Sequence, residues 1–228
     1  MPEAVVLLSG GLDSSTVLAL AKEAGFEPVA LTFDYGQKHK REIESAKRIA
    51  NHFHVKEHLI VPLDIGRFLA SSLTQRSMNV PSGRARAEIA SGIPSTYVPS
   101  RNIIFLTIAS AIAESRGVRS VFIATNAVDF SGYPDCTPEF IESFQKTLDI
   151  GTRAGREGRG VRVEAPILHK SKAEIVREAV RLKVPLELTW SCYKGGRKAC
   201  GTCDSCLLRL EGFREAGLED PLEYEVRN

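Results

Sequence analysis

A polar, glycine-rich segment, Ser9–Ser15 (SGGLDSS), follows directly after the apolar run Ala4–Leu8. A continuous apolar run of this length is typical of a central strand that is covered on both faces of a sheet. A helical pattern begins at Asp13 and continues to Ala24, and Gly25 is a residue type that commonly ends helices. A buried strand, a glycine turn and a helix in this order predict the first unit of a parallel α/β sheet.

Strands and helices alternate along the first 185 residues. The further expected strands are Pro28–Phe33, His58–Val61, Ser120–Thr125 and Val161–Ala165. The further expected helices are His39–His52, Asn102–Ser115, Pro138–Ile150 and a helix that begins at a capping box of Ser171 and Glu174 and runs to about Leu182. This alternation predicts a doubly wound, parallel, five-stranded α/β sheet with right-handed crossovers.

Three segments carry more specific expectations. The helix Asn102–Ser115 is apolar almost throughout, so we expect it to be buried. The segment Gln75–Gly92 is polar and weakly periodic, and we expect a loop that orders when a ligand binds. The segment Thr152–Gly160 is rich in glycine and arginine, and we expect a flexible loop.

The overall composition limits the classes of partner. The chain of 228 residues is 43% hydrophobic and carries a net charge of +2. That balance does not predict nucleic acid or an anionic membrane as an obligatory partner. No apolar stretch approaches the ~20 residues needed to span a bilayer, and the first residues do not resemble a signal peptide. We therefore expect a cytoplasmic protein.

The segment after the first strand has the features of an ATP-binding loop. Two glycines let the backbone turn its N–H groups inward, serine hydroxyls add donors, and the helix that follows contributes the positive end of its dipole. Asp13 would repel a bare phosphate, so we expect Mg²⁺ to bridge this residue to the nucleotide. The predicted ATP-binding residues are Leu8, Ser9, Gly10, Gly11, Leu12, Asp13, Ser14, Ser15 and Thr16.

Other interpretations of this segment are weaker. The kinase-type pattern G-x-x-x-x-G-K-[ST] needs a lysine that is not present, and the dinucleotide pattern G-x-G-x-x-G is also missing. A third interpretation is a tight turn at a helix start, with Asp13 as the N-cap. The complete segment after a buried strand favours phosphate binding over that turn.

The end of the chain carries a cysteine cluster. Cys192, Cys200, Cys203 and Cys206 supply four thiolates with two overlapping C-x-x-C steps. This pattern predicts a zinc site, with an iron–sulfur cluster or a pair of disulfides as the alternatives. Four thiolates leave no open coordination position, so the zinc would be structural. The fifth cysteine, Cys136, is expected to be a small packed residue.

The composition changes after residue 185, where these cysteines begin. We expect residues 1–185 to form a nucleotide-binding α/β domain and residues 186–228 to form a zinc-binding segment packed on it.

Two further groups follow strands at the edge of the sheet where ligands bind. The group after the fourth strand combines aromatic rings that would stack on a flat heterocycle with carboxylates that would accept from its N–H groups, and a plain surface turn is the alternative. Its residues are Asp129, Phe130, Ser131, Gly132, Tyr133 and Asp135. The second group consists of cations that would stabilise departing pyrophosphate together with Asp13, although solvated side chains are a reasonable alternative. These cations are Lys170, Lys172 and Arg101.

The segment S-G-G-x-D-S resembles the PP-loop of the ATP pyrophosphatases, a superfamily with a Rossmann-like, adenine nucleotide alpha hydrolase-like fold. The resemblance is closest to the 7-cyano-7-deazaguanine synthase family. It extends over Tyr35–His39 with Glu42, Pro99–Asn102, Asp129–Cys136, Lys170–Lys172 and the cysteine block. These segments span most of the chain, from Ser9 to Cys206.

The resemblance implies a ligase that forms C–N bonds. Its substrates would be 7-carboxy-7-deazaguanine, ammonia and ATP, and its product would be 7-cyano-7-deazaguanine (preQ0), a precursor in queuosine biosynthesis. ATP would be cleaved to AMP and pyrophosphate through an adenylated acid and an adenylated amide.

Two alternatives from other classes remain at this point: a PP-loop enzyme that adenylates tRNA, of the thiolation or lysidine type, and a non-enzymatic zinc-knuckle binding module. For the synthase interpretation, the expected partners are small molecules, with no nucleic acid and no membrane, and a homodimer is possible.

Overall fold

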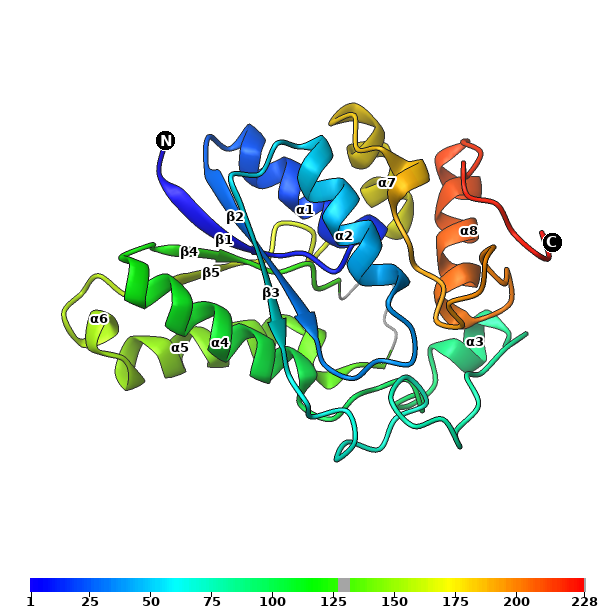
Figure 1. Cartoon of the computed structure of the whole chain (residues 1–228), viewed down its shortest axis with the longest axis horizontal. Coiled ribbons are helices and arrows are strands. Elements are labelled where there is room, and N and C mark those ends of the chain that lie inside the picture. Colours follow the sequence, from blue (N-terminus) through cyan, green and yellow to red (C-terminus); the bar gives the residue numbers. More distant parts are fainter. Residues whose placement is uncertain (127–131, 228) are drawn as a thin grey trace.

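The computed structural model describes residues 1–126 and 132–227. Within these residues, five parallel strands form one sheet in the order β3-β2-β1-β4-β5 (Figure 1). The predicted doubly wound sheet is therefore confirmed. The strands are β1 (Glu3–Leu7), β2 (Glu27–Asp34), β3 (Glu57–Pro62), β4 (Ser120–Phe122) and β5 (Arg162–Glu164).

Helices cover both faces of this sheet (Figure 1). One face carries α1 (Leu12–Glu23), α2 (Arg41–His52) and α7 (Lys172–Arg181). The other face carries α4 (Arg101–Arg116) and α5 (Pro138–Gly151). Beyond the carboxyl ends of the strands lies α8 (Asp204–Ala216), which packs against α7. Among the described residues, no helix is both long and apolar enough to cross a membrane.

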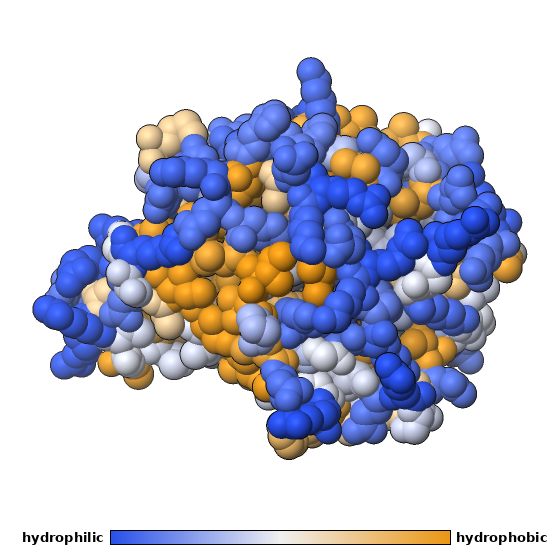
Figure 2. Space-filling model, viewed as in Figure 1, coloured by the Kyte–Doolittle hydropathy of each residue, from blue (hydrophilic) through white to orange (hydrophobic). Residues whose placement is uncertain are grey.

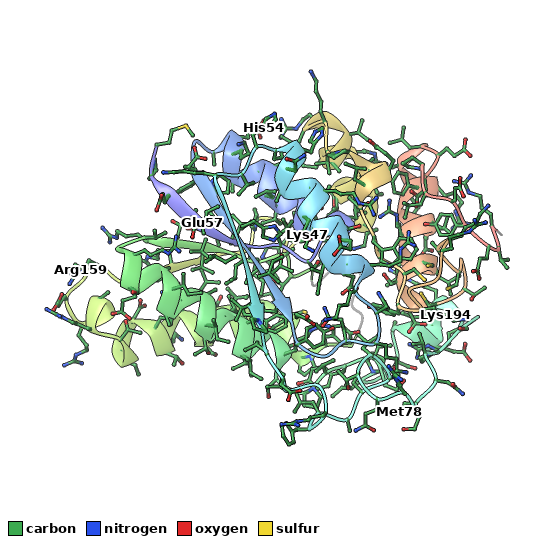
Figure 3. The ribbon with its side chains drawn as sticks, viewed as in Figure 1. Lys47, His54, Glu57, Met78, Arg159 and Lys194 are labelled. Carbon is green, nitrogen blue, oxygen red and sulfur yellow. The ribbon has the colours of Figure 1, made fainter. Side chains whose placement is uncertain are left out.

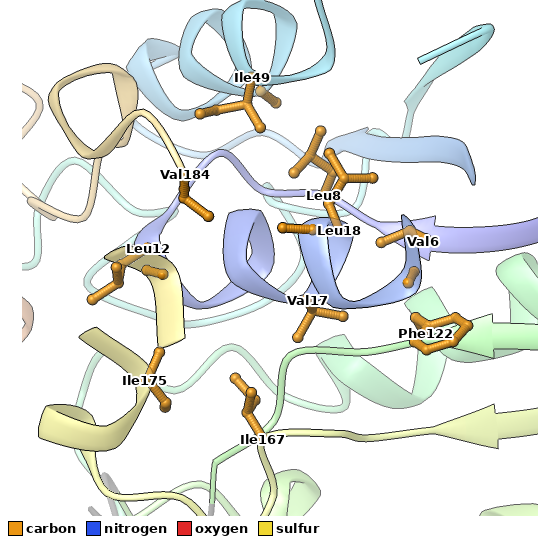
Figure 4. Packing of buried hydrophobic residues seen from close by; sticks show 14 of the residues in the cluster. Val6, Leu8, Leu12, Val17, Leu18, Ile49, Phe122, Ile167, Ile175 and Val184 are labelled. Atoms are coloured by element: carbon orange, nitrogen blue, oxygen red, sulfur yellow. The ribbon is translucent and has the colours of Figure 1, made fainter. Parts of the chain in front are cut away.

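The first strand separates two hydrophobic cores. Ala4, Val5 and Val6 are all 0% exposed, as the apolar run predicts for a central strand. Alternate side chains of a strand point to opposite faces, so Val6 packs among α1, α2 and α7 while Val5 packs among α4 and α5. Figure 4 shows the first of these cores, where Val17 and Leu18 of α1 lie close to β1 and Phe122 of β4.

The predicted helix ends are largely confirmed. The Ser171 hydroxyl accepts a hydrogen bond from the Glu174 N–H at 3.2 Å, and the Glu174 carboxylate accepts from the Ser171 N–H at 2.7 Å. This is the capping box that the sequence predicts. Gly117 ends α4 at φ 69°, a left-handed conformation that favours glycine.

One prediction about α4 is wrong: the helix is not fully buried. Its buried residues are Leu106, Ala109, Ser110 and Ala113, whereas Ile103 is 40% exposed. On the neighbouring edge strand β3, Ile60 is 38% exposed, and Figure 2 shows an apolar area over these two elements. The sequence pattern indicated burial all round because apolar residues occur on both sides of the helix.

The two predicted loops each contain one helical turn, α3 (Arg86–Ile89) and α6 (Arg153–Arg156). The segment 75–92 is held by the C-terminal residues: the Gly83 N–H donates to the Thr202 carbonyl at 2.8 Å, and Arg84 pairs with Asp204. Lys38 donates to the Met78 carbonyl from the other side, and Figure 3 labels Met78 at this end of the molecule. Contacts with the C-terminal residues and with Lys38 therefore hold this segment in the described structure.

Candidate active site

The order of the strands defines where a ligand can bind. β1 lies between β2 and β4, and the chain leaves β1 toward one side of the sheet and reaches β4 on the other. Parallel α/β sheets bind ligands at such a switch point, outside the carboxyl ends of the strands. The glycine turn after β1 and residues 123–126 after β4 both lie at this edge.

The glycine turn is pressed against α2. Gly10 has φ 83°, and a Cβ atom built on it would lie 2.4 Å from the Ala46 nitrogen and 2.5 Å from the Glu42 carbonyl oxygen. Its own carbonyl accepts a hydrogen bond from the Trp190 N–H at 2.8 Å. The turn therefore requires glycine at this position both for its backbone conformation and for its close contact with α2.

The serines of the turn do not all face the ligand side. Ser9 and Ser14 lie with their hydroxyl oxygens 3.0 Å apart, and both residues line the pocket. The Ser15 hydroxyl instead donates to the Gly11 carbonyl at 2.8 Å, and the Thr16 hydroxyl donates to the Leu12 carbonyl at 2.9 Å. The Ser14 hydroxyl also lies 3.2 Å from the Gly11 carbonyl, but Ser14 lines the pocket, whereas Ser15 is not among its lining residues.

The predicted ATP-binding residues thus separate into two sets. Those that line the pocket are Leu8, Ser9, Gly11, Leu12, Asp13 and Ser14, while Gly10, Ser15 and Thr16 lie behind them. The residue that caps α1 is Gly11, so Asp13 is not the N-cap. The turn thus presents the first turn of a helix, its N–H groups and two hydroxyls to the pocket.

Asp13 is paired with a lysine from the other end of the domain. The Lys172 ammonium lies 2.7 and 2.9 Å from the two Asp13 carboxylate oxygens. Lys172 is the first residue of α7, and a Cβ atom built on Gly212 of α8 would lie 2.3 Å from its Cγ. Three helices therefore fix the position of this pair.

The other two predicted cations have different surroundings. Arg101 lines the pocket, donates to the Tyr35 hydroxyl at 3.3 Å, and lies 5.8 and 5.9 Å from the ring centroids of Tyr35 and Tyr133. The Lys170 side chain is not among the described residues that line the pocket, and the Lys170 carbonyl accepts from the Asn126 amide. The structure brings Asp13, Lys172 and Arg101 to one cavity and leaves Lys170 outside it.

The cavity has a volume of about 300 Å³ and an aromatic end. Tyr133, one of the predicted substrate residues, lines it, and its hydroxyl lies 2.8 Å from the Thr96 hydroxyl and 3.5 Å from the Tyr193 hydroxyl. Tyr35 also lines the cavity, and its ring, like that of Tyr133, lies within 6 Å of the Arg101 guanidinium. Aromatic rings near a cation, beside a glycine turn at a helix N-terminus, are suited to a planar, partly anionic substrate.

Gly132 and Asp135, two other predicted substrate residues, are not among those that line the cavity. Asp129, Phe130 and Ser131 lie outside the described residues. Gly132 has φ 78° and packs against the Gly92 carbonyl, because a Cβ atom there would lie 2.1 Å from that oxygen. Asp135 is 4% exposed, and its carboxylate accepts from the Asn102 N–H at 3.0 Å at the start of α4.

Cys136 lines the cavity beside Asn102, whose amide donates to the sulfur at 3.3 Å. Burial raises the pKa of the Cys136 thiol to about 12, which the nearby carboxylate of Asp135 reinforces. A raised pKa favours the protonated thiol, which is consistent with the expectation that Cys136 is a small packed residue.

Sequence reasoning missed two residues that the structure places in the cavity. Glu42 points into it from the first turn of α2, and burial raises the pKa of Glu42 to about 7. Tyr193, next to Cys192, forms part of its wall. Glu42 was part of a recognised motif, but nothing in the sequence showed that its side chain would face the ligand.

The cysteine cluster has the geometry of a metal site. The sulfur atoms of Cys192, Cys200, Cys203 and Cys206 lie within 4.8 Å of one another, and all four residues are buried. A tetrahedral ion with bonds of about 2.3 Å would separate its ligand sulfurs by about 3.8 Å. The sulfurs of Cys200 and Cys206 are 3.9 Å apart, which is far longer than a disulfide of about 2.0 Å.

Backbone donors complete this site. The Cys200 N–H donates to the Cys192 sulfur at 3.3 Å, and the Cys203 N–H donates to the Cys200 sulfur at 3.3 Å. Such bonds stabilise thiolates and fix their orientation. The cluster can hold one metal ion, and its four cysteines are present as free thiols without a disulfide bond.

Residues next to the cysteine cluster form part of the cavity wall. Trp190, Ser191 and Tyr193 flank Cys192 and line the pocket. The Trp190 indole N–H donates to the Cys192 carbonyl at 2.9 Å, and the Arg41 guanidinium lies 4.2 Å from the centre of the indole ring. The metal site and the candidate active site therefore share a short stretch of chain.

Comparison with known proteins identifies the family. The family model described as Queuosine biosynthesis protein QueC matches residues 3–217. The 7-cyano-7-deazaguanine synthase of Thermoplasma acidophilum is 54% identical over 98% of this chain and 92% of its own, and that of Acetivibrio thermocellus is 51% identical over the full length of both.

A solved structure, the NMN synthetase from Francisella tularensis, shares the fold at 15% identity, with a TM-score of 0.50 over 95% of this chain and 78% of that chain. The sequence similarity to the family is far more specific than this similarity of fold. The family match includes both the glycine turn after β1 and the cysteine cluster. The chain belongs to the QueC family of queuosine biosynthesis proteins, alongside its 7-cyano-7-deazaguanine synthases.

Proposed function

We propose that this chain is a C–N ligase that converts 7-carboxy-7-deazaguanine and ammonia to 7-cyano-7-deazaguanine, with two ATP molecules cleaved to AMP and pyrophosphate. Its family and relatives support this activity over the tRNA-modifying alternative. The structural observation that carries the proposal is one cavity that holds a phosphate-binding turn, the Asp13–Lys172 pair and an aromatic end.

The first half of the reaction turns the acid into an amide. A carboxylate is a poor electrophile, because its leaving group would be oxide. Attack of a carboxylate oxygen on the α-phosphorus of ATP releases pyrophosphate and forms an acyl adenylate. Ammonia then attacks the acyl carbon, AMP leaves, and the amide remains after loss of a proton.

The second half removes the amide oxygen. That oxygen attacks the α-phosphorus of a second ATP and releases a second pyrophosphate. Loss of AMP and of the nitrogen-bound protons then forms the carbon–nitrogen triple bond. The overall reaction consumes one acid, one ammonia and two ATP, and it yields one nitrile, two AMP and two pyrophosphate.

The chain's own residues contribute positioning and charge neutralisation. The N–H groups at the start of α1, with the hydroxyls of Ser9 and Ser14, would bind the departing pyrophosphate. Lys172 would neutralise charge that develops as the bond to the α-phosphorus breaks. Arg101 would hold the anionic carboxyl group, because its guanidinium faces the same cavity.

Asp13 fits Mg²⁺, because this ion prefers oxygen ligands and the Asp13 carboxylate lines the pocket with 28% of its side chain exposed. The bound ion would supply charge neutralisation for the phosphates. The four clustered cysteines fit Zn²⁺, which would be structural, because all four positions of a tetrahedron would be taken by sulfur.

The remaining partners are also proposals. We infer a cytoplasmic enzyme of small-molecule substrates that does not require nucleic acid or a membrane. The apolar area over β3 and α4 supports a homodimer through this face, because edge strands with exposed apolar residues favour association.

The test is the identity of the products. The purified chain with ATP, Mg²⁺, ammonia and 7-carboxy-7-deazaguanine should yield the nitrile, with two AMP and two pyrophosphate for each nitrile formed. Chromatography and mass spectrometry measure both. Release of ADP and phosphate would overturn the adenylation mechanism, and absence of the nitrile would overturn the substrate.

A further inference from the structure

Glu42 is a half-buried acidic side chain on the wall of the cavity, where the charge of Arg101 acts on it and opposes the burial that raises its pKa. In the part of the chain that the structure describes, no hydrogen bond or ion pair joins its carboxylate to another group, and Glu42 lines the pocket. A half-buried carboxylate on a cavity wall, with no hydrogen bond to the described residues, is available to accept hydrogen bonds from a ligand.

The neighbouring acceptors are already in use. The Gln37 side chain accepts from the Tyr35 N–H at 2.9 Å and donates to the Phe33 carbonyl at 3.3 Å. Asp13 is paired with Lys172, and the Asp135 carboxylate accepts from the Asn102 N–H. Unlike these three side chains, the Glu42 carboxylate therefore remains open to a ligand.

The substrate class carries a matching pair of donors. A 7-deazaguanine has a ring N–H and an exocyclic amino group side by side on its six-membered ring, and a carboxylate accepts two parallel hydrogen bonds from such an edge. We propose that Glu42 recognises this donor edge and is the residue that selects a guanine-type base. The inference rests on the proposed function.

This contact also orients the reacting group. The carboxyl group is on the five-membered ring, away from the donor edge. A base anchored at Glu42 would therefore direct its carboxyl group toward the cations and the phosphate turn of the same cavity. Tyr35, next to Arg101, and Tyr133 supply rings against which the planar base can stack.

The variants that test this role are Glu42→Gln and Glu42→Ala, with Glu44→Gln as the matched control. Glu44 lies on the same helix, but its side chain is 55% exposed and pairs with Lys47 at 2.8 Å on the surface. Glutamine keeps the shape of glutamate, so Glu42→Gln remains informative if Glu42→Ala does not fold. Thermal melting establishes the folded state of each variant.

Each variant is assayed with 7-carboxy-7-deazaguanine and with the analogue that lacks the exocyclic amino group. The wild type and Glu44→Gln should prefer the natural base by about 10- to 100-fold in kcat/KM, which is the usual discrimination from a bidentate pair. Glu42→Gln should retain less than about 3-fold preference, with a raised KM for the base and an unchanged KM for ATP. Calorimetric titration of the base without ATP should show the same loss of discrimination.

The outcomes are distinct. If the wild type forms no nitrile from the natural base, the proposed function fails. If the wild type forms it and the folded Glu42→Gln variant keeps the full preference for the amino group, the role of Glu42 is overturned while the function stands. Loss of turnover with unchanged base affinity and unchanged preference would likewise overturn recognition by Glu42.

Discussion

The Lys172 ammonium lies 2.7 Å from a carboxylate oxygen of Asp13, although 159 positions separate the two residues in the chain. Their side chains are only 16% and 28% exposed, so the charges compensate each other in a partly dehydrated setting. Binding of a nucleotide with its cation would give each member a new partner. The pair is therefore suited to accept a highly charged ligand without leaving either charge uncompensated.

Replacing Lys172 by Ala should lower kcat by about 100- to 1000-fold, the usual effect of removing one group that stabilises developing charge. Asp13→Ala should abolish AMP formation. Both variants should stay folded, because the pair is not fully buried. AMP release and thermal melting measure the two effects. Lys47→Ala is the control, because the Lys47 side chain, on α2 and labelled in Figure 3, is 49% exposed. Equal losses in Lys47→Ala and Lys172→Ala would contradict this role.

Gly212→Ala should disturb the active site from α8. The added Cβ would lie 2.3 Å from the Lys172 Cγ and 2.9 Å from its Cβ, so the lysine stem must move. We expect a fall in kcat of at least about 10-fold and a loss of stability of about 1–3 kcal/mol from overpacking. Gly151→Ala, where a Cβ meets nothing within 4 Å, should leave both unchanged. Steady-state kinetics measures kcat and denaturant unfolding measures stability. Equal values for the Gly212→Ala variant and the wild type would contradict the prediction.

Removal of the metal should affect both stability and the active site. Metal analysis should find one zinc per chain. Trp190 is the single tryptophan of the sequence and bonds to the Cys192 carbonyl, so its fluorescence reports on the knuckle. A chelator should shift this emission, lower the melting temperature and raise the KM for the base. Iron in place of zinc, or an unchanged emission after complete removal, would refute the assignment.

Asp220→Ala should be strongly destabilising. Arg209 and Asp220 form a bidentate pair at 2.7 and 3.0 Å with side chains 2% and 0% exposed, and the Tyr224 hydroxyl donates to the same carboxylate. Removal of one partner leaves a buried charge, which costs about 3–5 kcal/mol. Glu219→Ala breaks an exposed pair with Arg227 and should cost about 0–1 kcal/mol. Urea unfolding measures the stability of both variants. Similar losses of stability in Asp220→Ala and Glu219→Ala would contradict the role of the buried pair.

His58 should make stability depend on pH. Burial, reinforced by the Lys47 charge, lowers the pKa of His58, so the folded state resists its protonation. Stability from this group is present above the unfolded pKa of about 6.5 and is lost as pH falls toward the lower folded value. His58→Gln should therefore lose less stability than the wild type between pH 7.5 and 5.5. His52 is exposed, so the stability of His52→Gln should change with pH as that of the wild type does when both are unfolded in urea.

The sequence determined those features that neighbouring residues create together. The apolar run before the glycine turn predicted β1 and α1, and Ser171 with Glu174 predicted the start of α7, because strand periodicity and capping are local. The spacing of the cysteines predicted their cluster, since C-x-x-C places two sulfurs on one turn. The fold class followed from these signals, which also predicted that the turn after β1 binds phosphate.

The tertiary structure decided which distant residues meet. It placed Lys172 next to Asp13 and left Lys170 out of the residues that line the cavity. It also placed Glu42 and Tyr193 in the cavity wall. Folding brings these residues together across long stretches of chain, and no periodic pattern in the sequence encodes which lysine or carboxylate faces a cavity. For the same reason, the sequence did not predict the exposed side of α4. Apolar residues show that a helix packs against other elements, but the positions of those elements determine which side of the helix is buried.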